Sequence, residues 1–223
     1  MLLSAFHPLT LLDYPGKTAC IVFTVGCNFR CGFCHNPDFV LPERIMKIKD
    51  SFVATEAFFE FLERRVGLLD GVVICGGEPT VQANIEPFIR RIKSLGFLVK
   101  LDTNGSNPEV LKKLLFPAEG KPLIDMVAMD IKRDIETYGN IKTLMSSEEL
   151  PSIIRESIAL LDASGIELEF RTTVAKGVHT PEMIRSIIRE IPARSNYALQ
   201  NFRNGNILNP DFSGSPFTDA ELE

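Results

Sequence analysis

The sequence predicts an α/β protein built on a parallel β-sheet. Short apolar segments rich in β-branched residues alternate along the chain with segments that carry apolar residues at helical spacing. Because a strand, a helix and a second strand in this order form a crossover, strict alternation implies parallel strands with helices between them. Strands are expected at residues 18–24, 71–75, 97–102, 126–131, 166–174 and 197–202.

The segments between these strands have the end signals of helices. Thr55 is a candidate N-cap, and Pro108 and Pro181 stand where the first helical residue is expected. Gly96 and Gly165 follow the last apolar residues of two segments, as C-terminal glycines do. Helices are expected at residues 55–65, 84–95, 107–115, 147–163 and 180–191.

Two architectures fit this alternation, a doubly wound open sheet and a barrel or partial barrel. Polar or reactive residues follow the first four strands, and Arg171 lies within the fifth. A site assembled from many strand ends is typical of the carboxyl-terminal face of a barrel. An open sheet instead concentrates its ligand contacts at one switch point. The placement of these residues therefore favours the barrel.

The composition gives no sign of a nucleic-acid or membrane partner. The chain has 223 residues with 24 basic and 29 acidic side chains, so it lacks the excess of positive charge that is typical of proteins that bind nucleic acids or anionic membranes. Residues 1–10 are apolar but have no basic region or cleavage site, and no apolar run reaches the roughly 18 residues of a bilayer span. We expect a soluble cytoplasmic protein in which residues 1–202 form one domain. Residues 203–223 are expected to form a polar tail that either caps the site or is disordered.

Three of the five cysteines lie close together in the segment VGCNFRCGFCHNPDF, with the spacing C-x3-C-x2-C. In a reducing compartment, clustered cysteines are typical of metal ligands or catalytic thiols. Iron–sulfur clusters are usually held by four cysteines, so three would leave one iron open to a substrate. Cys27, Cys31 and Cys34 are therefore candidate cluster ligands.

Other uses of these cysteines explain less of the sequence. A structural zinc site needs a fourth ligand, and His35 is poorly placed beside Cys34 to share its metal. A redox dithiol of Cys31 and Cys34 leaves Cys27 unexplained. Two further cysteines, Cys20 and Cys75, lie in expected strands and are interpreted as small core residues.

Conspicuous residues also follow the second, third and fourth strands. In the GGEP segment, two glycines would let a ligand approach the backbone, and Glu78 could accept hydrogen bonds from an ammonium group. Asp102 in LDTNG would be costly to bury unpaired. Asp130 and Lys132 in MDIK either form an ion pair near the surface or belong to the same ligand site at the carboxyl ends of the strands.

In this order, CxxxCxFCHNPD, GGEP, LDTNG, MDIK and the arginine of FRTTV resemble the radical S-adenosylmethionine (SAM) superfamily. Within it, the sequence is most similar to the glycyl-radical-enzyme activase family, especially the activating proteins of anaerobic ribonucleoside-triphosphate reductase. The resemblance spans residues 11–202 and implies a partial (βα)6 barrel of the radical SAM type. Residues 38–70 contain no further cysteine, which resembles the short, single-cluster members.

The resemblance implies a role for each matching residue. Cys27, Cys31 and Cys34 would hold a [4Fe–4S] cluster; Phe33, His35 and Asn36 would lie beside the adenine; and Gly76, Gly77 and Glu78 would form the methionine-binding turn of SAM. Asp102, Thr103 and Asp130 match positions that in relatives can hold a monovalent cation near the SAM carboxylate, and Lys132 and Arg171 match further SAM contacts. Asp13, in LDYPG, matches a residue that contacts the glycyl loop of a protein substrate. Relatives often have glycine where this chain has Tyr14.

The implied activity is reductive cleavage of SAM to methionine and a 5′-deoxyadenosyl radical. A donor such as flavodoxin or ferredoxin would supply the electron, and the radical would generate a glycyl radical on a partner such as anaerobic ribonucleoside-triphosphate reductase. A radical SAM enzyme acting on a small molecule, for instance a pterin or nucleotide derivative, is the first alternative. A non-enzymatic electron carrier or zinc scaffold is the second.

Overall fold

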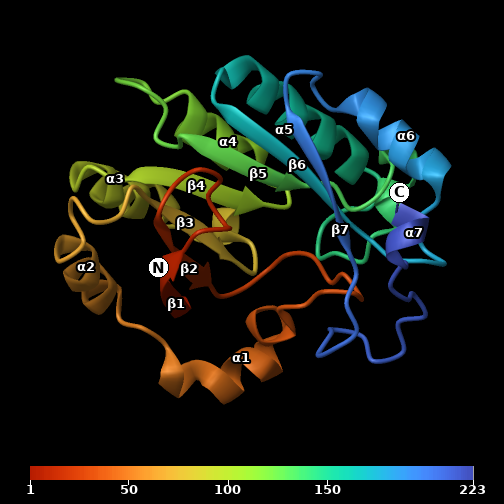
Figure 1. Cartoon of the computed structure of the whole chain (residues 1–223), viewed down its shortest axis with the longest axis horizontal. Helices are drawn as coiled ribbons and strands as arrows, with labels where there is room; N and C mark the ends of the chain where they lie inside the picture. The colour runs from red at the N-terminus through yellow and green to blue at the C-terminus, as the bar shows by residue number, and fades with distance from the viewer. Residues whose placement is uncertain (223) are drawn as a thin grey trace.

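The computed structural model describes residues 1–222 and contains one seven-stranded sheet (Figure 1). The strands follow one another across the sheet in sequence order, and all neighbours from β2 onward are parallel. A doubly wound sheet reverses its strand order at a switch point, and this sheet does not. The strands are β1 (Leu3–Thr10), β2 (Ala19–Thr24), β3 (Gly71–Gly76), β4 (Leu98–Thr103), β5 (Met126–Asp130), β6 (Glu167–Val174) and β7 (Asn196–Asn201).

The expected partial (βα)6 barrel is therefore confirmed, with one added strand. Strand β1 pairs antiparallel with β2 and covers the edge that β2 would otherwise expose. This strand was not among those expected from the sequence. Its register shifts between Leu3 and Ala5 and between His7 and Thr10, which breaks the alternation that marks a strand.

Helices lie between successive parallel strands, and α3 to α6 follow one side of the sheet in Figure 1. All five expected helices are present, although Thr55 is the first helical residue and Ala54 occupies the cap position. The short α1 was not expected, whereas α7 lies where residues 218–223 have the pattern of a helix start. The helices are α1 (Pro42–Ile48), α2 (Thr55–Glu63), α3 (Ile85–Ser94), α4 (Pro108–Leu115), α5 (Leu150–Ser164), α6 (Pro181–Glu190) and α7 (Asp219–Leu222).

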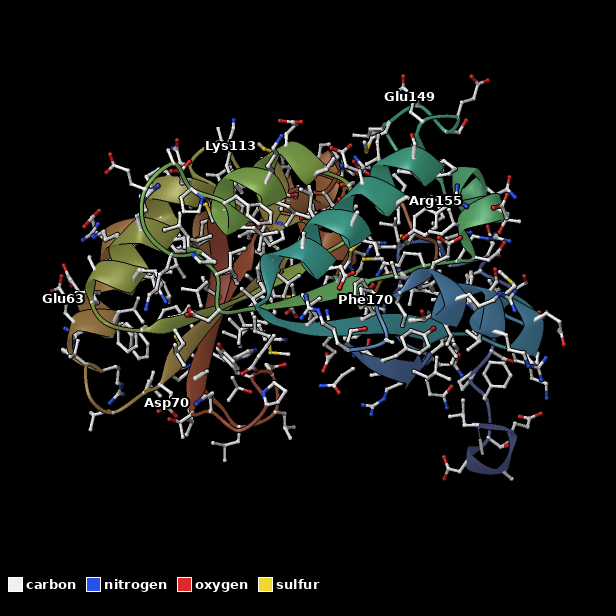
Figure 2. The ribbon with its side chains drawn as sticks, turned by 90° about the horizontal axis from the view of Figure 1, so that it is seen from above. Glu63, Asp70, Lys113, Glu149, Arg155 and Phe170 are labelled. Carbon is white, nitrogen blue, oxygen red and sulfur yellow. The ribbon has the colours of Figure 1, made fainter. Side chains whose placement is uncertain are left out.

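The two faces of the sheet differ in chemistry. Buried apolar residues of the outward face pack under the helices, as Phe170 of β6 does beneath α5, while Lys113 and Arg155 point away from the sheet (Figure 2). The inward face has a small apolar cluster that includes Tyr14 and Val73, and it also carries charged residues. This contrast leaves the barrel interior as the place for a polar site. Among residues 1–222, no helix has the length and apolar character needed to cross a bilayer.

Candidate active site

A single cleft contains every residue that the sequence assigned to the cluster and to SAM. It lies at the carboxyl ends of the parallel strands, where loops after β2, β3, β4 and β5 meet. The assigned residues that line it are Cys27, Cys31, Phe33, Cys34, His35, Asn36, Gly76, Gly77, Glu78, Asp102, Thr103, Asp130, Lys132 and Arg171. The sequence missed six further lining residues: Phe29, Val40, Cys75, Asn104, Thr173 and Gln200.

The three cysteines of the motif lie on the loop that follows β2, where each is half-buried. Burial raises the pKa of the Cys27 thiol to about 12, with smaller contributions from Glu78 and the other two cysteines, and burial also raises the pKa of Cys31 to about 11. The thiols are thus neutral at physiological pH, and binding of iron would have to displace their protons. Within residues 1–222, no three Cys, His, Asp or Glu side chains converge on a point that could hold a single metal ion. A cubane takes one thiolate on each of three irons, so its ligands stand further apart than those of a single ion.

Asparagine side chains connect this loop to the segment that follows β4. Asn28 Nδ2 donates to Ser106 Oγ at 2.8 Å, and Asn104 Nδ2 donates to Asn28 Oδ1 at 3.1 Å. Thr143 Oγ1 donates to the Asn28 carbonyl at 2.9 Å. The cysteine loop is therefore fixed from two directions, which local sequence patterns could not reveal.

The tail packs on the outer side of the cysteine loop. Leu208 N donates to the Cys34 carbonyl at 3.2 Å, and Asn209 N donates to the Gly32 carbonyl at 3.0 Å. The Phe212 ring lies 5.6 Å from the Phe33 ring, centroid to centroid. In Figure 1 the blue tail returns to the orange loop below β7. Of the two expectations for the tail, these contacts favour a cap over the cysteine loop.

The two glycines of GGEP serve the chain's own backbone. Gly76 has a φ of +123°, which favours glycine, and a Cβ on Gly77 would lie 2.1 Å from the Gly26 carbonyl oxygen. Glu78 N donates to that same carbonyl at 2.8 Å. The glycines therefore let the turn after β3 pack directly on the start of the cysteine loop, a role that the sequence analysis had given to a ligand.

Replacing Gly77 with alanine is expected to lower the free energy of unfolding by at least about 2 kcal/mol, because the methyl group would overlap backbone that cannot move freely. Chemical denaturation of the apoprotein measures this change. Gly205→Ala is the matched control, since a Cβ there meets no atom within 4 Å. Equal stability of the two variants would contradict the close packing at Gly77.

Glu78 connects the strand ends of β3 and β4. Its Oε1 accepts hydrogen bonds from Thr80 N, Thr80 Oγ1 and Thr103 Oγ1 at 3.0, 2.6 and 2.7 Å, and its Oε2 accepts from Asn104 N at 2.6 Å. The side chain is buried but still lines the cleft. Oε1 is thus saturated by the chain itself, and Oε2 is the oxygen with capacity left for a bound ammonium group.

Charged residues of the inward face form one network at the bottom of the cleft. Arg171 joins the two aspartates, with Nη1 3.1 Å from Asp102 Oδ2 and Nε 2.9 Å from Asp130 Oδ1. Lys100 Nζ lies 2.8 Å from Asp102 Oδ1, and Lys132 Nζ lies 2.8 Å from Asp130 Oδ2. Burial alone would raise the pKa of Asp130, but Lys132 and Arg171 outweigh it and lower this pKa to about 2. Asp130 therefore stays ionised at neutral pH.

Asp13 is the one assigned residue that the structure does not bring to the cleft. Its turn precedes β2 and so lies at the amino-terminal end of the parallel strands. The neighbouring Tyr14 packs against Gly71 at the start of β3, where a Cβ on Gly71 would lie 3.0 Å from the Tyr14 ring. Burial and the negative charges of Asp125 and Glu167 raise the pKa of the Tyr14 phenol, which places this side chain beside the starts of β5 and β6. Tyr14 and its apolar neighbours therefore separate Asp13 from the cleft.

The two remaining cysteines differ in environment. Cys20 is fully buried in the core under the helices, as expected. Cys75 was also expected in the core, but it faces inward at the end of β3 and lines the cleft. Successive side chains of a strand point to opposite faces of the sheet, so Cys75 lies on the same inward face as Val73, two residues before it.

The protein-family model described as Radical SAM superfamily matches residues 21–191. This chain belongs to the radical SAM superfamily. A protein of Methanocaldococcus jannaschii described as "Putative glycyl-radical enzyme activating enzyme" is 33% identical over 218 residues, which cover 96% of this chain and 85% of that protein. This radical SAM protein is therefore an enzyme of the glycyl-radical-enzyme activating family.

One further relative agrees at lower coverage, and one solved structure supports the fold. The pyruvate formate-lyase-activating enzyme of Listeria monocytogenes is 33% identical over 129 residues, covering 55% of this chain and 49% of that enzyme. The crystal structure of Streptococcus suis SuiB bound to S-adenosylmethionine superposes with a TM-score of 0.63 at 14% identity. That match covers 91% of this chain and 46% of SuiB, and at this identity it supports the fold alone.

The residues of this radical SAM enzyme fit both groups that the superfamily implies. Three half-buried thiols on one loop suit a cluster with an open iron, and the cleft beside them combines carboxylates with fixed cations, as a zwitterionic ligand requires. A monovalent cation does not fit these residues in the same way, because each carboxylate oxygen assigned to it already contacts a lysine or arginine side chain.

Proposed function

We propose that this enzyme uses a [4Fe–4S] cluster on Cys27, Cys31 and Cys34 to cleave SAM and generate a glycyl radical on a partner enzyme such as anaerobic ribonucleoside-triphosphate reductase. The observation that carries this proposal is the convergence of the cysteine loop and all the assigned SAM residues in one cleft. When bound, the cluster and SAM supply the one-electron chemistry that yields a 5′-deoxyadenosyl radical.

The side chains of the cleft bind and orient SAM in this proposal. Glu78 Oε2 accepts from the methionyl ammonium group, while Lys132 and Arg171 attract the methionyl carboxylate. Phe33, His35 and Asn36 surround the adenine on the side of the cysteine loop. The tail over this loop limits the access of water.

The electron donor is an acidic protein such as flavodoxin or ferredoxin. A second cavity borders the other side of the cysteine loop, where it is lined by Cys31 together with Arg30, Arg133 and Lys142. Basic side chains next to a cluster ligand favour the docking of an acidic donor, because complementary charges steer association.

A radical SAM enzyme acting on a small molecule remains the competing function. The family relationship favours protein activation, because the M. jannaschii relative matched over nearly the whole chain is described as an activating enzyme. The fold alone does not distinguish the two, since similar barrels belong to SuiB, solved with the precursor peptide SuiA, and to anSMEcpe, solved with the Cp18Cys peptide.

Electron paramagnetic resonance tests the proposal directly. The reconstituted enzyme is mixed anaerobically with a candidate glycyl radical protein from the same cell, a reductant and SAM. A glycyl-radical doublet should appear only when both SAM and reductant are present. The small-molecule function would replace protein activation if two results came together. No candidate protein would give the glycyl-radical doublet, and a small metabolite would stimulate SAM cleavage and be consumed.

Asp13 is proposed as a contact to the protein partner. It is exposed on a loop that also exposes Leu11 and Leu12, the latter 90% accessible, next to the exposed Leu9 of β1. A polar acceptor therefore lies within an apolar surface. Asp13→Asn should reduce activation of the partner severalfold at low partner concentration while iron content and SAM binding stay normal.

The control for this variant is Asp50→Asn, which changes an exposed aspartate elsewhere on the surface. Initial rates of radical formation at several partner concentrations measure the effect. If Asp13→Asn activates the partner as well as Asp50→Asn does, Asp13 only stabilises its own turn, where Thr10 Oγ1 donates to its carboxylate at 2.5 Å.

A further inference from the structure

Lys100 is a buried charge inside the barrel. It lies on β4 between the inward-facing Leu98 and Asp102, and its exposed fraction is 2%. A lysine ammonium is strongly hydrated in water, so its burial is unfavourable unless a carboxylate compensates for the lost hydration. Its Nζ lies 2.8 Å from Asp102 Oδ1, so a fixed monovalent cation contacts a carboxylate of the SAM cleft.

The two aspartates of the cleft have no carboxylate oxygen without a cationic partner. Asp102 faces Lys100 and Arg171, and Asp130 faces Arg171 and Lys132, with one cation at each oxygen and N···O distances of 2.8 to 3.1 Å. A mobile sodium or potassium ion would need these oxygens as ligands, and the fixed cations would repel it.

Thr103 is equally engaged, because its hydroxyl donates to Glu78 Oε1 at 2.7 Å. The site that the sequence analysis assigned to a monovalent cation on Asp102, Thr103 and Asp130 is thus already occupied by contacts within the chain. The residue responsible at Asp102 is Lys100, which the sequence analysis did not single out.

We infer that the Lys100 ammonium takes the place of an exchangeable monovalent cation in this enzyme, so that the SAM carboxylate is bound without added sodium or potassium. This inference rests on the proposed function. Lys100 contacts Asp102 and does not line the cleft among the residues that the structure describes, so it is a positioning residue. Its charge holds Asp102 in place while Arg171 and Lys132 attract the ligand.

Equilibrium dialysis of SAM against the reconstituted holoenzyme tests the inference. The dissociation constant is measured at one ionic strength in choline chloride, sodium chloride and potassium chloride. The wild-type values should agree within about twofold, because the required cation is part of the chain. Tightening of about tenfold or more by sodium or potassium would overturn the inference.

Lys100→Met removes the charge and keeps most of the side-chain length. This variant should bind SAM about tenfold more weakly in choline chloride, and potassium or sodium should restore much of the loss by occupying the vacated position. Lys100→Arg keeps the charge and should remain insensitive to the salt. The control Lys113→Met changes an exposed lysine of α4 and should behave like the wild type.

The outcomes separate this inference from the function on which it rests. A Lys100→Met variant with lower thermal stability, unchanged SAM affinity and no response to potassium would make Lys100 a structural ion pair and overturn the inference. If Lys100→Met fails to fold, the salt series of the wild type decides alone. Absence of SAM binding by the wild type in every salt would refute the proposed function, and the inference would fall with it.

Discussion

Replacing Cys27, Cys31 or Cys34 with alanine is expected to abolish the iron–sulfur cluster. Anaerobic reconstitution of the wild type should yield about four irons and four sulfides per chain, and each variant should retain almost none. The reason is that the three thiols line one cleft, so loss of one leaves a second iron without a protein ligand. Iron and sulfide analysis together with the visible absorption spectrum measure the change.

The remaining cysteines provide the controls for this experiment. Cys20→Ala changes a thiol in the core under the helices, and Cys75→Ala changes one that lines the cleft from β3 but does not belong to the C-x3-C-x2-C motif. Both should reconstitute a full cluster. Stoichiometric zinc without sulfide in anaerobically purified wild type would contradict the cluster and favour a zinc scaffold.

Glu78→Ala is expected to affect both stability and SAM binding. The substitution leaves two backbone N–H groups and two hydroxyls without their acceptor in a buried place. Because each buried unsatisfied donor costs about 1–3 kcal/mol, the free energy of unfolding should fall by about 3 kcal/mol or more. The control Glu86→Ala removes a partly exposed carboxylate paired with Arg90 and should change stability by less than about 1 kcal/mol.

Glu78→Gln separates the structural role from contact with the cofactor. The amide keeps the shape of the side chain but removes the negative charge, so SAM affinity should fall by at least about tenfold, as expected for a charge-assisted hydrogen bond. The dissociation constant of SAM in the reconstituted protein measures this effect. A folded Gln variant with the affinity of the wild type would mean that Glu78 only connects the strand ends.

Local patterns in the sequence were enough to predict the elements and the composition of the cleft. The parallel strands and the helices between them are predicted by the spacing of apolar residues within each segment. That spacing involves only residues a few positions apart. The cleft was predictable because parallel strands bring their carboxyl ends to one edge, so residues such as Glu78, Asp102 and Asp130 had to lie close together.

The sequence did not decide between a barrel and a doubly wound sheet by periodicity. Both have the same alternation of strands and helices, and only the order of strands across the sheet distinguishes them. Strand β1 was missed for a related reason, because its register shifts disturb the alternation and its pairing partner lies in another segment.

Residues that act through distant contacts were decided by the tertiary structure alone. In the sequence, Lys100 is indistinguishable from an ordinary strand residue. In the structure its side chain points inward and contacts Asp102, whose other carboxylate oxygen contacts Arg171, 71 positions further along the chain. Asp13 matched a sequence motif, yet the fold places it at the opposite end of the strands from the cleft. The sequence by itself determined which chemical groups this enzyme brings to its site. The packing of segments far apart in the chain decided which of those groups contact one another, because such contacts leave no periodic signal in either segment.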